Sequence, residues 1–405
     1  MPGALRRELG LASAVAVVVG SMIGVGIFVG PTEIAPLLPS PGLVLLAWVL
    51  GGLLIFCGAL SFAELGAALP ESGGPYAYMR EAYGRFVAFL TGWTGFSVGK
   101  AASTSALAVA TSAVKLGAIA ALVLGGVALL SGNAPALASE RLVPAGGSLL
   151  DYVPAFGLAL IPVFFAYDGW SNSTQVAEEV RDPGRNVPRS LILGTLAVGV
   201  AYTLATLVYF LALGSGGVAE DGAAARAAAR LVGPVGATLI VAAILVSITG
   251  TVNAVTLSGP RIAFAMARDG VFPRRVERIS RWGTPAWSIV LQSAISVALV
   301  LVPPIGDRPL FSTLLDYIVF DSFVFYALGA AAVIVLRRRR PELARPYKVP
   351  LYPWVPLVFV LGSVAFLLNT LLTRPLEALG GLAIIAAGLP VYFLSARAGT
   401  RPGRG

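Results

Sequence analysis

Three glycines interrupt the first long apolar run of the chain, in the nine-residue stretch Gly20–Phe28 (GSMIGVGIF). The run from Leu11 to Val29 is close to the length of about 20 apolar residues that crosses a bilayer. Each glycine costs about 1 kcal/mol relative to alanine inside a helix, so a plain anchor gains nothing from them. Unwound backbone lining a cavity would instead expose N–H groups, which bind anions such as carboxylates. Close helix packing through small residues explains this stretch equally well on its own.

A second interruption lies at Phe164–Trp170 (FFAYDGW), which places Asp168 and Gly169 within an apolar run and precedes the polar segment Ser171–Gln175. A carboxylate at the bilayer centre costs about 2.5–3.5 kcal/mol, so Asp168 is expected to face a cavity or a partner. A helix end at the membrane interface is the alternative. Paired interruptions in the two halves of a membrane protein typically mark a transporter site. The two stretches together predict a small-molecule site between broken helices.

Lys100, Lys115, Asp321 and Glu64 are among the other ionisable residues that lie in or next to apolar runs. Lys115 would, on its own, be read as a lysine at a helix end whose long stem reaches the membrane surface. Lys100 is expected to pair with Asp168 or Asp321, or to face water. Asp321 either faces an internal cavity or joins a buried ion pair, and Glu64 is expected in the interface. The arginine run 337–340 is expected to mark a helix end, with attraction of anionic lipid as the weaker reading.

The composition defines the class of protein. Hydrophobic residues make up 57% of the 405 residues and charged residues 12%, and the mean hydropathy is +0.84, which predicts a multi-pass membrane protein. Histidine is absent and the single cysteine, Cys57, lies in a predicted span, so an enzyme, a metal site and a cofactor are not expected. The basic residues lie in loops, so nucleic acid is not an expected partner. No cleavable signal peptide is expected after the short basic arm Met1–Glu8.

The distribution of basic residues predicts the topology. Eleven spans are predicted, at residues 11–36, 42–69, 85–112, 113–131, 153–175, 189–214, 233–267, 285–303, 309–336, 352–373 and 377–396. With a cytoplasmic N-terminus, 22 of the 29 lysines and arginines lie on the cytoplasmic side, five on the outside and two within spans. This excess predicts that the N-terminus is cytoplasmic.

The number of crossings between residues 85 and 132 does not fit this topology. The segment 71–85 is predicted inside and the segment 132–152 outside, so an odd number of spans must connect them. Residues 86–131 are too many for one span at about 1.5 Å per residue and read as two helices. Either one of these helices does not span, or a further helix is missing between them.

Several further motifs follow in order along most of the chain: Glu71–Tyr78 (ESGGPYAY), Glu178–Pro188 (EEVRDPGRNVP), Ala267–Pro273 (ARDGVFP), Arg339–Glu342 (RRPE) and Arg345–Pro350 (RPYKVP). With the two interruptions, these motifs resemble the amino acid–polyamine–organocation transporters, and within them the bacterial L-type amino acid transporter branch. The resemblance implies one all-α transmembrane domain over residues 1–396 with a LeuT-like fold. Its first five-helix repeat would cover 11–131, an inverted second repeat 153–336 and two extra helices 352–396, with a cytoplasmic tail at 397–405.

The chain departs from this family after Ala106–Ala110 (ALAVA), which matches the third helix. It continues almost directly to Lys115, which resembles a lysine of the fifth helix. The fourth helix of the first repeat is therefore expected to be missing, which leaves about 11 spans. The helices around 100–131 have then either rearranged, or the chain is an internally deleted relative.

The resemblance also implies the site residues. Backbone N–H groups at the first break would hold the carboxylate of an amino acid, and hydroxyl or carbonyl oxygens of both breaks would hold its ammonium: Gly24, Val25 and Gly26 for the carboxylate, and Ser21, Ile23, Phe165 and Ala166 for the ammonium. Phe165 would also act as a gate. Asp168 would either favour cationic side chains or pair with a protein cation. Lys115 would take the place of a sodium ion and couple transport to protons.

The predicted function is a secondary active permease or exchanger of L-amino acids. It would work by alternating access in the plasma membrane, the inner membrane of a bacterium, without sodium and with the amino acid and the lipid bilayer as its partners. No cysteine lies in a predicted outer loop, so a disulfide-linked heavy chain is not expected. The alternative is a non-transporting relative that binds an amino acid, either a sensor or an internally deleted remnant.

Overall fold

The computed structural model describes residues 7–38, 40–71, 73–98, 106–130, 149–273, 276, 286–301 and 309–399. Within these ranges the regular structure is helical apart from one isolated bridge. The α-helices are α1 (Leu11–Met22), α2 (Gly26–Ile34), α3 (Pro41–Ala68), α4 (Pro75–Tyr83), α5 (Arg85–Val98), α6 (Ala106–Leu130), α8 (Val153–Tyr167), α9 (Asn172–Gln175), α10 (Pro183–Val218), α11 (Ala223–Val232), α12 (Pro234–Arg268), α13 (Ala286–Leu301), α14 (Leu310–Arg339), α15 (Trp354–Thr373) and α16 (Pro375–Gly399). Two 3-10 turns are η2 (Leu149–Tyr152) and η3 (Ala177–Glu179).

Seven helical stretches in the described part of the chain are long and apolar enough to cross a membrane: Leu11–Ile34, Pro41–Ala68, Leu150–Tyr167, Pro183–Val218, Leu310–Arg339, Trp354–Thr373 and Pro375–Ser395. Three shorter apolar helices are Ala113–Ala128, Pro234–Thr249 and Trp287–Ala298. The all-helical, multi-pass architecture predicted from the sequence is therefore confirmed. These candidates are fewer than the eleven predicted spans. The described part of α5 has 14 residues, about 21 Å of helix, which is too short to cross a bilayer.

The predicted boundary between residues 112 and 113 is wrong. α5 runs over Arg85–Val98, and α6 is a continuous helix over Ala106–Leu130 that passes through the predicted boundary. The physical reason is local, because the segment from Ala106 to Leu116 contains neither glycine nor proline and is rich in alanine and leucine. Nothing in those residues stops a helix.

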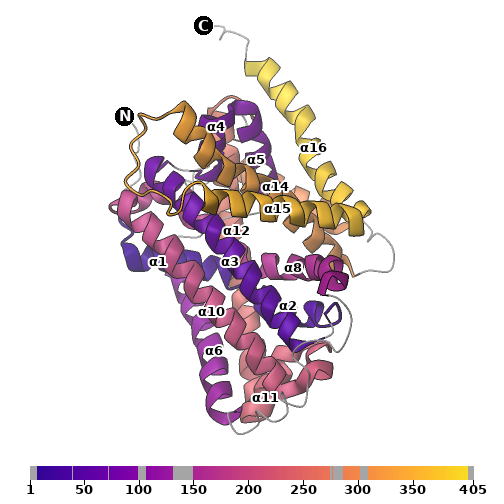
Figure 1. Ribbon diagram of the computed structural model, residues 1–405. Coiled ribbons are helices and arrows are strands. Elements are labelled where there is room, and N and C mark those ends of the chain that lie inside the picture. The colour runs from indigo at the N-terminus through magenta and orange to yellow at the C-terminus, as the bar shows by residue number, and fades with distance from the viewer. Residues whose placement is uncertain are drawn as a thin grey trace.

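The side of the bundle where α1 begins is called the basic side below. A parallel bridge joins Leu9 to Val180 there, with Leu9 N–H donating to Glu179 O at 3.0 Å and Arg181 N–H donating to Leu9 O at 2.9 Å. The segment before α1 is thus tied to the segment before α10, and both helices begin on this side. Figure 1 shows α6 and α10 running alongside each other toward α11, and α16 leading away from the rest of the bundle to the C-terminus.

α6 runs in the same direction as α1 and α10. Near its middle, the amine of Lys115 lies 3.3 Å from the carbonyl oxygen of Gly20 in α1. Further along, Gly126 lies against Val208 in the second half of α10. Since α1 and α10 begin on the basic side, α6 begins there too.

α5 packs against the end of α12 in the opposite direction, with Gly92 against Met266 and Gly95 against Ile262. α12 ends on the basic side, where Asp269 meets Arg80, so α5 also begins there. The consecutive helices α5 and α6 therefore run in the same direction, and the chain makes one net crossing between the start of α5 and the end of α6. The sequence required an odd number of crossings between residues 85 and 132 but indicated two helices. One net crossing resolves this conflict.

Glu64 of α3 was expected in the interface, and this expectation is wrong. Its side chain is 2% exposed and accepts hydrogen bonds from Arg337 at 2.8 Å and from the backbone N–H of Val349 at 2.7 Å. Arg345 lies 3.5 Å away, and the guanidinium of Arg337 also covers the ring of Tyr352. One buried carboxylate thus joins α3, the end of α14 and the segment before α15. The arginine run does mark a helix end, and Arg337 binds protein there.

Candidate binding site between two broken helices

The first interruption is a genuine helix break. α1 ends at Met22 and α2 begins at Gly26, and Ile23 between them has φ −74° and ψ 87°, outside the helical region. The N–H of Gly24 donates to Met22 O at 2.8 Å in a tight turn. Val25 and Gly26 stand at the start of α2, where backbone N–H groups have no partner within the helix and a positive partial charge collects. These groups suit an anion.

The second interruption is also a break, as the sequence predicted. α8 ends at Tyr167 and α9 begins at Asn172. Asp168 has φ −59° and ψ 151°, an extended conformation. Gly169 follows with φ +95°, a region that favours glycine because it has no Cβ.

The two breaks touch each other through their glycines. A Cβ added to Gly26 would lie 2.5 Å from Cα of Ala166, and one added to Gly169 would lie 2.7 Å from the carbonyl oxygen of Ser21. Real Cβ atoms essentially never approach this closely. The sequence offered two explanations for the glycines, a helix break and close packing through small residues. Both hold, because the glycines lie at the breaks and also let the two backbones meet. The structure brings Ser21, Gly26 and Ala166 together.

Two carbonyl groups of the breaks share one tyrosine. The hydroxyl of Tyr202, on α10, lies 2.8 Å from Met22 O and 3.2 Å from Ala166 O, and Tyr202 is fully buried. A hydroxyl has one proton and so donates to one of these oxygens at a time. The Ile23 carbonyl accepts from Ser247 of α12 at 3.5 Å. Of the three carbonyls assigned to the ammonium, those of Ile23 and Ala166 are thus contacted by protein hydroxyls, and that of Phe165 accepts from the N–H of Asp168 at 3.1 Å.

Sequence reasoning missed Tyr202 and Ser247, because a hydroxyl within an apolar run gives no signal of what it will meet. Both lie far along the chain from the break that they contact, on α10 and α12.

Lys115 lies against the first break. Its side chain is 2% exposed, and its amine donates to Gly20 O at 3.3 Å, so it is not a lysine that reaches the membrane surface. Gly20 lies in the last turn of α1, where a cation is favoured by the partial negative charge of the helix end.

Asp168 is bound by a neighbouring helix. Its Oδ1 accepts from the hydroxyl of Tyr326 on α14 at 2.6 Å. Asp321, on the same helix, is fully buried and accepts from the Ser322 hydroxyl at 3.2 Å. Lys100, a predicted partner of both acids, lies outside the described residues. Phe165 is half-buried, and its ring meets the ring of Phe311 edge-on at 6.0 Å between centroids.

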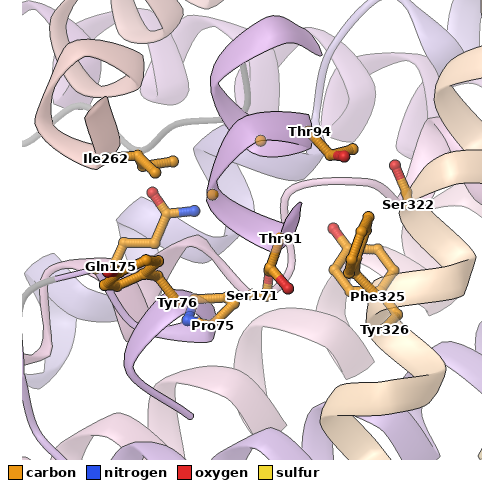
Figure 2. A pocket seen from close by; sticks show the side chains of 13 residues that line it. Pro75, Tyr76, Thr91, Thr94, Ser171, Gln175, Ile262, Ser322, Phe325 and Tyr326 are labelled. Atoms are coloured by element: carbon orange, nitrogen blue, oxygen red, sulfur yellow. The ribbon is translucent and has the colours of Figure 1, made fainter. Parts of the chain in front are cut away.

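A cavity lies beside the second break on the side of α5 and α14. It offers about 50 Å³ to water-sized molecules, enough for a few waters. Figure 2 shows its walls, with Thr91 and Thr94 on α5 opposite Ser322 and Tyr326 on α14. Ser171 and Gln175 line it from the segment after the break. None of its 13 lining residues carries a formal charge.

An ionic cluster adjoins the cavity on the basic side. Tyr76 of α4 lines the cavity and donates through its hydroxyl to Asp269 at 2.7 Å. Arg80 lies 3.3 Å from Asp269 and 2.7 Å from Glu71. Burial and this hydrogen bond raise the pKa of Tyr76 well above its usual value, so it remains a donor to Asp269 over the physiological range.

Comparison with known proteins identifies related sequences over almost the whole chain. The family model described as amino acid permease matches residues 9–99 and 94–386, in two segments that overlap at the end of α5. The serine/threonine exchanger SteT of Bacillus subtilis is 31% identical over 432 aligned positions, which cover 96% of this chain and 97% of that protein. The Asc-type amino acid transporter 1 of mouse is 29% identical, and the match covers 96% of this chain and 81% of the mouse protein.

A solved structure supports the fold. The crystal structure of a mutant manganese transporter from Eremococcus coleocola matches with a TM-score of 0.56 and 15% identity over 96% of both chains. At this identity the match concerns the fold alone, which is all-helical and LeuT-like.

Proposed function

The chain belongs to the amino acid permease family of membrane transporters, and on that premise we propose that it moves L-amino acids across the cell membrane by alternating access without sodium. The observation that carries the proposal is the contact between two broken helices at Gly26 and Ala166. This contact places the start of α2 next to the end of α8, so the positive end of one helix lies beside the negative end of the other.

An amino acid would bind at the two breaks through its two charged ends. The carboxylate is assigned to the N–H groups of Val25 and Gly26, with Gly24 contributing once its turn to Met22 opens. The ammonium is assigned to Ser21 and to the carbonyls of Ile23, Phe165 and Ala166. No ionised side chain is needed for either end. Phe165 is assigned as the gate, supported by its position next to Phe311.

Lys115 is assigned the coupling role. Its buried amine donates to the last turn of α1 at Gly20, so a protein cation already stabilises the helix end beside the break. A second cation at the same place would be repelled, which supports transport without sodium. Because a buried lysine changes its protonation readily, this residue is also suited to proton coupling.

The topology is proposed as one transmembrane domain over residues 1–396 with the N-terminus in the cytoplasm and the fourth family helix absent. The alignment to the Bacillus subtilis exchanger has 432 positions, whereas 96% of 405 residues is about 389, so about 43 positions have no residue in this chain. A helix that crosses a bilayer takes about 20 residues, so these positions, summed over the alignment, are enough for a helix with its loops. The parallel directions of α5 and α6 support the same conclusion. When two successive helices of a membrane bundle run in the same direction, a helix running the opposite way normally lies between them in the chain.

The protein is proposed to act without a disulfide-linked partner. Cys57 is the single cysteine of the sequence, and it is a free, half-buried thiol in α3. A thiol at this position within a helix is not in an outer loop, so it would not form a disulfide with a partner outside the membrane.

The test is uptake by purified protein in proteoliposomes. A labelled panel of neutral, cationic and aromatic amino acids is offered with and without internal amino acid, with sodium replaced by choline and with an imposed pH gradient. Serine and threonine belong in the panel because one relative is named for them. We expect uptake that internal substrate stimulates and that sodium does not affect. The absence of uptake and exchange for every amino acid, with folded protein, would contradict the proposal.

The missing helix favours one second candidate, a relative that binds an amino acid and does not transport it. This candidate predicts thermal stabilisation of the purified protein by an amino acid without flux in the same preparation. Flux of that amino acid would exclude it.

Tyr202→Phe is expected to slow transport about tenfold, which corresponds to the loss of one hydrogen bond of about 1.4 kcal/mol. The hydroxyl ties Met22 O to Ala166 O across the two breaks, and phenylalanine keeps the ring packing. The rate of exchange in proteoliposomes is the measurement.

Tyr209→Phe is the matched control for this prediction. Tyr209 is buried in the same helix, and its hydroxyl has no hydrogen-bond partner within the described structure. Its removal is expected to leave the exchange rate unchanged and the thermal stability equal or higher. Equal rates for the two variants would show that the hydroxyl between the breaks has no part in transport.

A further inference from the structure

The breaks are filled on one face, and a cavity lies beside the second break on the other face. On the filled face, Tyr202 and Lys115 contact carbonyl groups of the first break. On the other face lies the cavity between α5 and α14, and its wall at Ser171 is two residues beyond Gly169, whose backbone meets Ser21. If an amino acid binds at the breaks, as proposed above, its side chain has this cavity as neighbouring space.

The lining of the cavity suits a short, uncharged polar group. Its polar atoms include the hydroxyls of Thr91, Thr94, Ser171 and Ser322 and the amide of Gln175. The nearby carboxylate of Asp168 accepts from the hydroxyl of Tyr326, so it does not present an open anionic wall. The cavity has space for a few water molecules, which suits a short side chain such as that of serine or threonine.

One hydroxyl in this lining stands out. Thr94 is 2% exposed, and its Oγ1 has no hydrogen-bond partner within the described residues. The hydroxyl of Thr91, one turn earlier on α5, donates instead to Val87 O of its own helix at 2.9 Å. The hydroxyl of Ser322 likewise has acceptors on its own helix, Ile318 O and Asp321 Oδ1, and donates to one of them at a time. Buried hydroxyls normally have a partner, so the Thr94 hydroxyl is poised for a group that enters the cavity.

We propose that this cavity receives the side chain of the transported amino acid, and that Thr94 selects side chains bearing a hydroxyl, as in threonine and serine, over apolar ones of equal size. The Thr94 hydroxyl gains its missing hydrogen bond from a hydroxylated substrate. A valine-sized apolar group in the same space leaves Thr94 unpartnered and therefore binds more weakly.

The experiment compares threonine with valine, which differ by a hydroxyl in place of a methyl group. Initial uptake rates at low concentration are measured in proteoliposomes for the unmodified protein, Thr94→Val and Thr91→Val. The unmodified protein is expected to favour threonine at least tenfold. Thr94→Val is expected to bring the threonine-to-valine ratio close to one. Thr91→Val is expected to keep the ratio of the unmodified protein, whatever happens to the absolute rate, because its hydroxyl bonds within its own helix.

The outcomes separate this inference from the proposed function. An unchanged ratio in Thr94→Val, or the same loss of ratio in Thr91→Val, overturns the role of Thr94. Preferred uptake of arginine or tryptophan overturns the assignment of the cavity. If no amino acid is transported, the proposed function fails. The same ratio is then read from thermal stabilisation of the purified variants by threonine and valine, and it still decides the role of Thr94. Size-exclusion chromatography of each variant excludes misfolding as the cause of a lost signal.

Discussion

Gly26→Ala is expected to reduce transport at least 100-fold. The added Cβ would lie 2.5 Å from Cα and 3.1 Å from N of Ala166. Both of these atoms belong to the backbone of α8, so no side-chain rotation relieves the contact. The two broken helices must separate by about 1 Å, and a displacement of this size at a site that positions a small molecule costs about 100-fold in rate.

The measurement is the exchange rate in proteoliposomes together with thermal stability. The matched control is Gly117→Ala on α6, where the added Cβ meets nothing within 4 Å beyond the adjoining residues and backbone of its own helix. Alanine is the better helix former there, so transport is expected to be unchanged and stability equal or slightly higher. Normal transport by Gly26→Ala would show that the close approach of the two breaks is not required.

Glu64→Ala is expected to destabilise the protein by about 3 kcal/mol or more, because it removes the anion of a buried ionic group. The carboxylate is 2% exposed and binds Arg337, Arg345 and the N–H of Val349. Without it, two guanidinium groups and one backbone donor lose their carboxylate partner at the junction of α3, α14 and the segment before α15. The thermal midpoint in detergent is the measurement.

The control for Glu64 is Glu342→Ala, on the same side of the bundle. Glu342 pairs with Arg340 at 2.5 Å, but it is exposed, and solvent screens an exposed pair so that it contributes little to stability. We expect no measurable change in the midpoint. If Glu64→Ala changes the midpoint no more than Glu342→Ala does, the buried group does not hold these helices together.

The sequence predicted the two breaks because their signals are local. Glycine and aspartate inside apolar runs conflict with an uninterrupted membrane helix, and Gly20–Phe28 and Phe164–Trp170 both contain the breaks found in the structure. The mismatch between the predicted spans and the topology over residues 85–132 was informative as well, since this is the region where α5 and α6 run in the same direction. The family relationship was recoverable from several short motifs in a fixed order.

The contacts that complete the site were not predictable in this way. Tyr202 and Thr94 lie in apolar helices where a hydroxyl can meet its own helix, another helix or a cavity, and the sequence does not distinguish these cases. The burial of Glu64 depends on Arg337, which lies 273 residues later in the chain. The start of α6 at Ala106 was not predicted, because the alanines and leucines around it favour helix on both sides and mark no boundary. Partner choice over such distances is set by packing, which a single sequence does not record.

The bridge between Leu9 and Val180 consists of main-chain atoms alone. It connects the basic-side end of the first broken helix to the segment that follows the second one, so these two arms cannot part without losing two amide hydrogen bonds. Side-chain substitutions at these positions leave the donors and acceptors in place, and only proline at Leu9 or Arg181 would remove an N–H group. We therefore expect the two segments to move together as one rigid unit. Their coupling does not depend on the side chains at Leu9 and Val180, so these positions can vary in sequence without changing it.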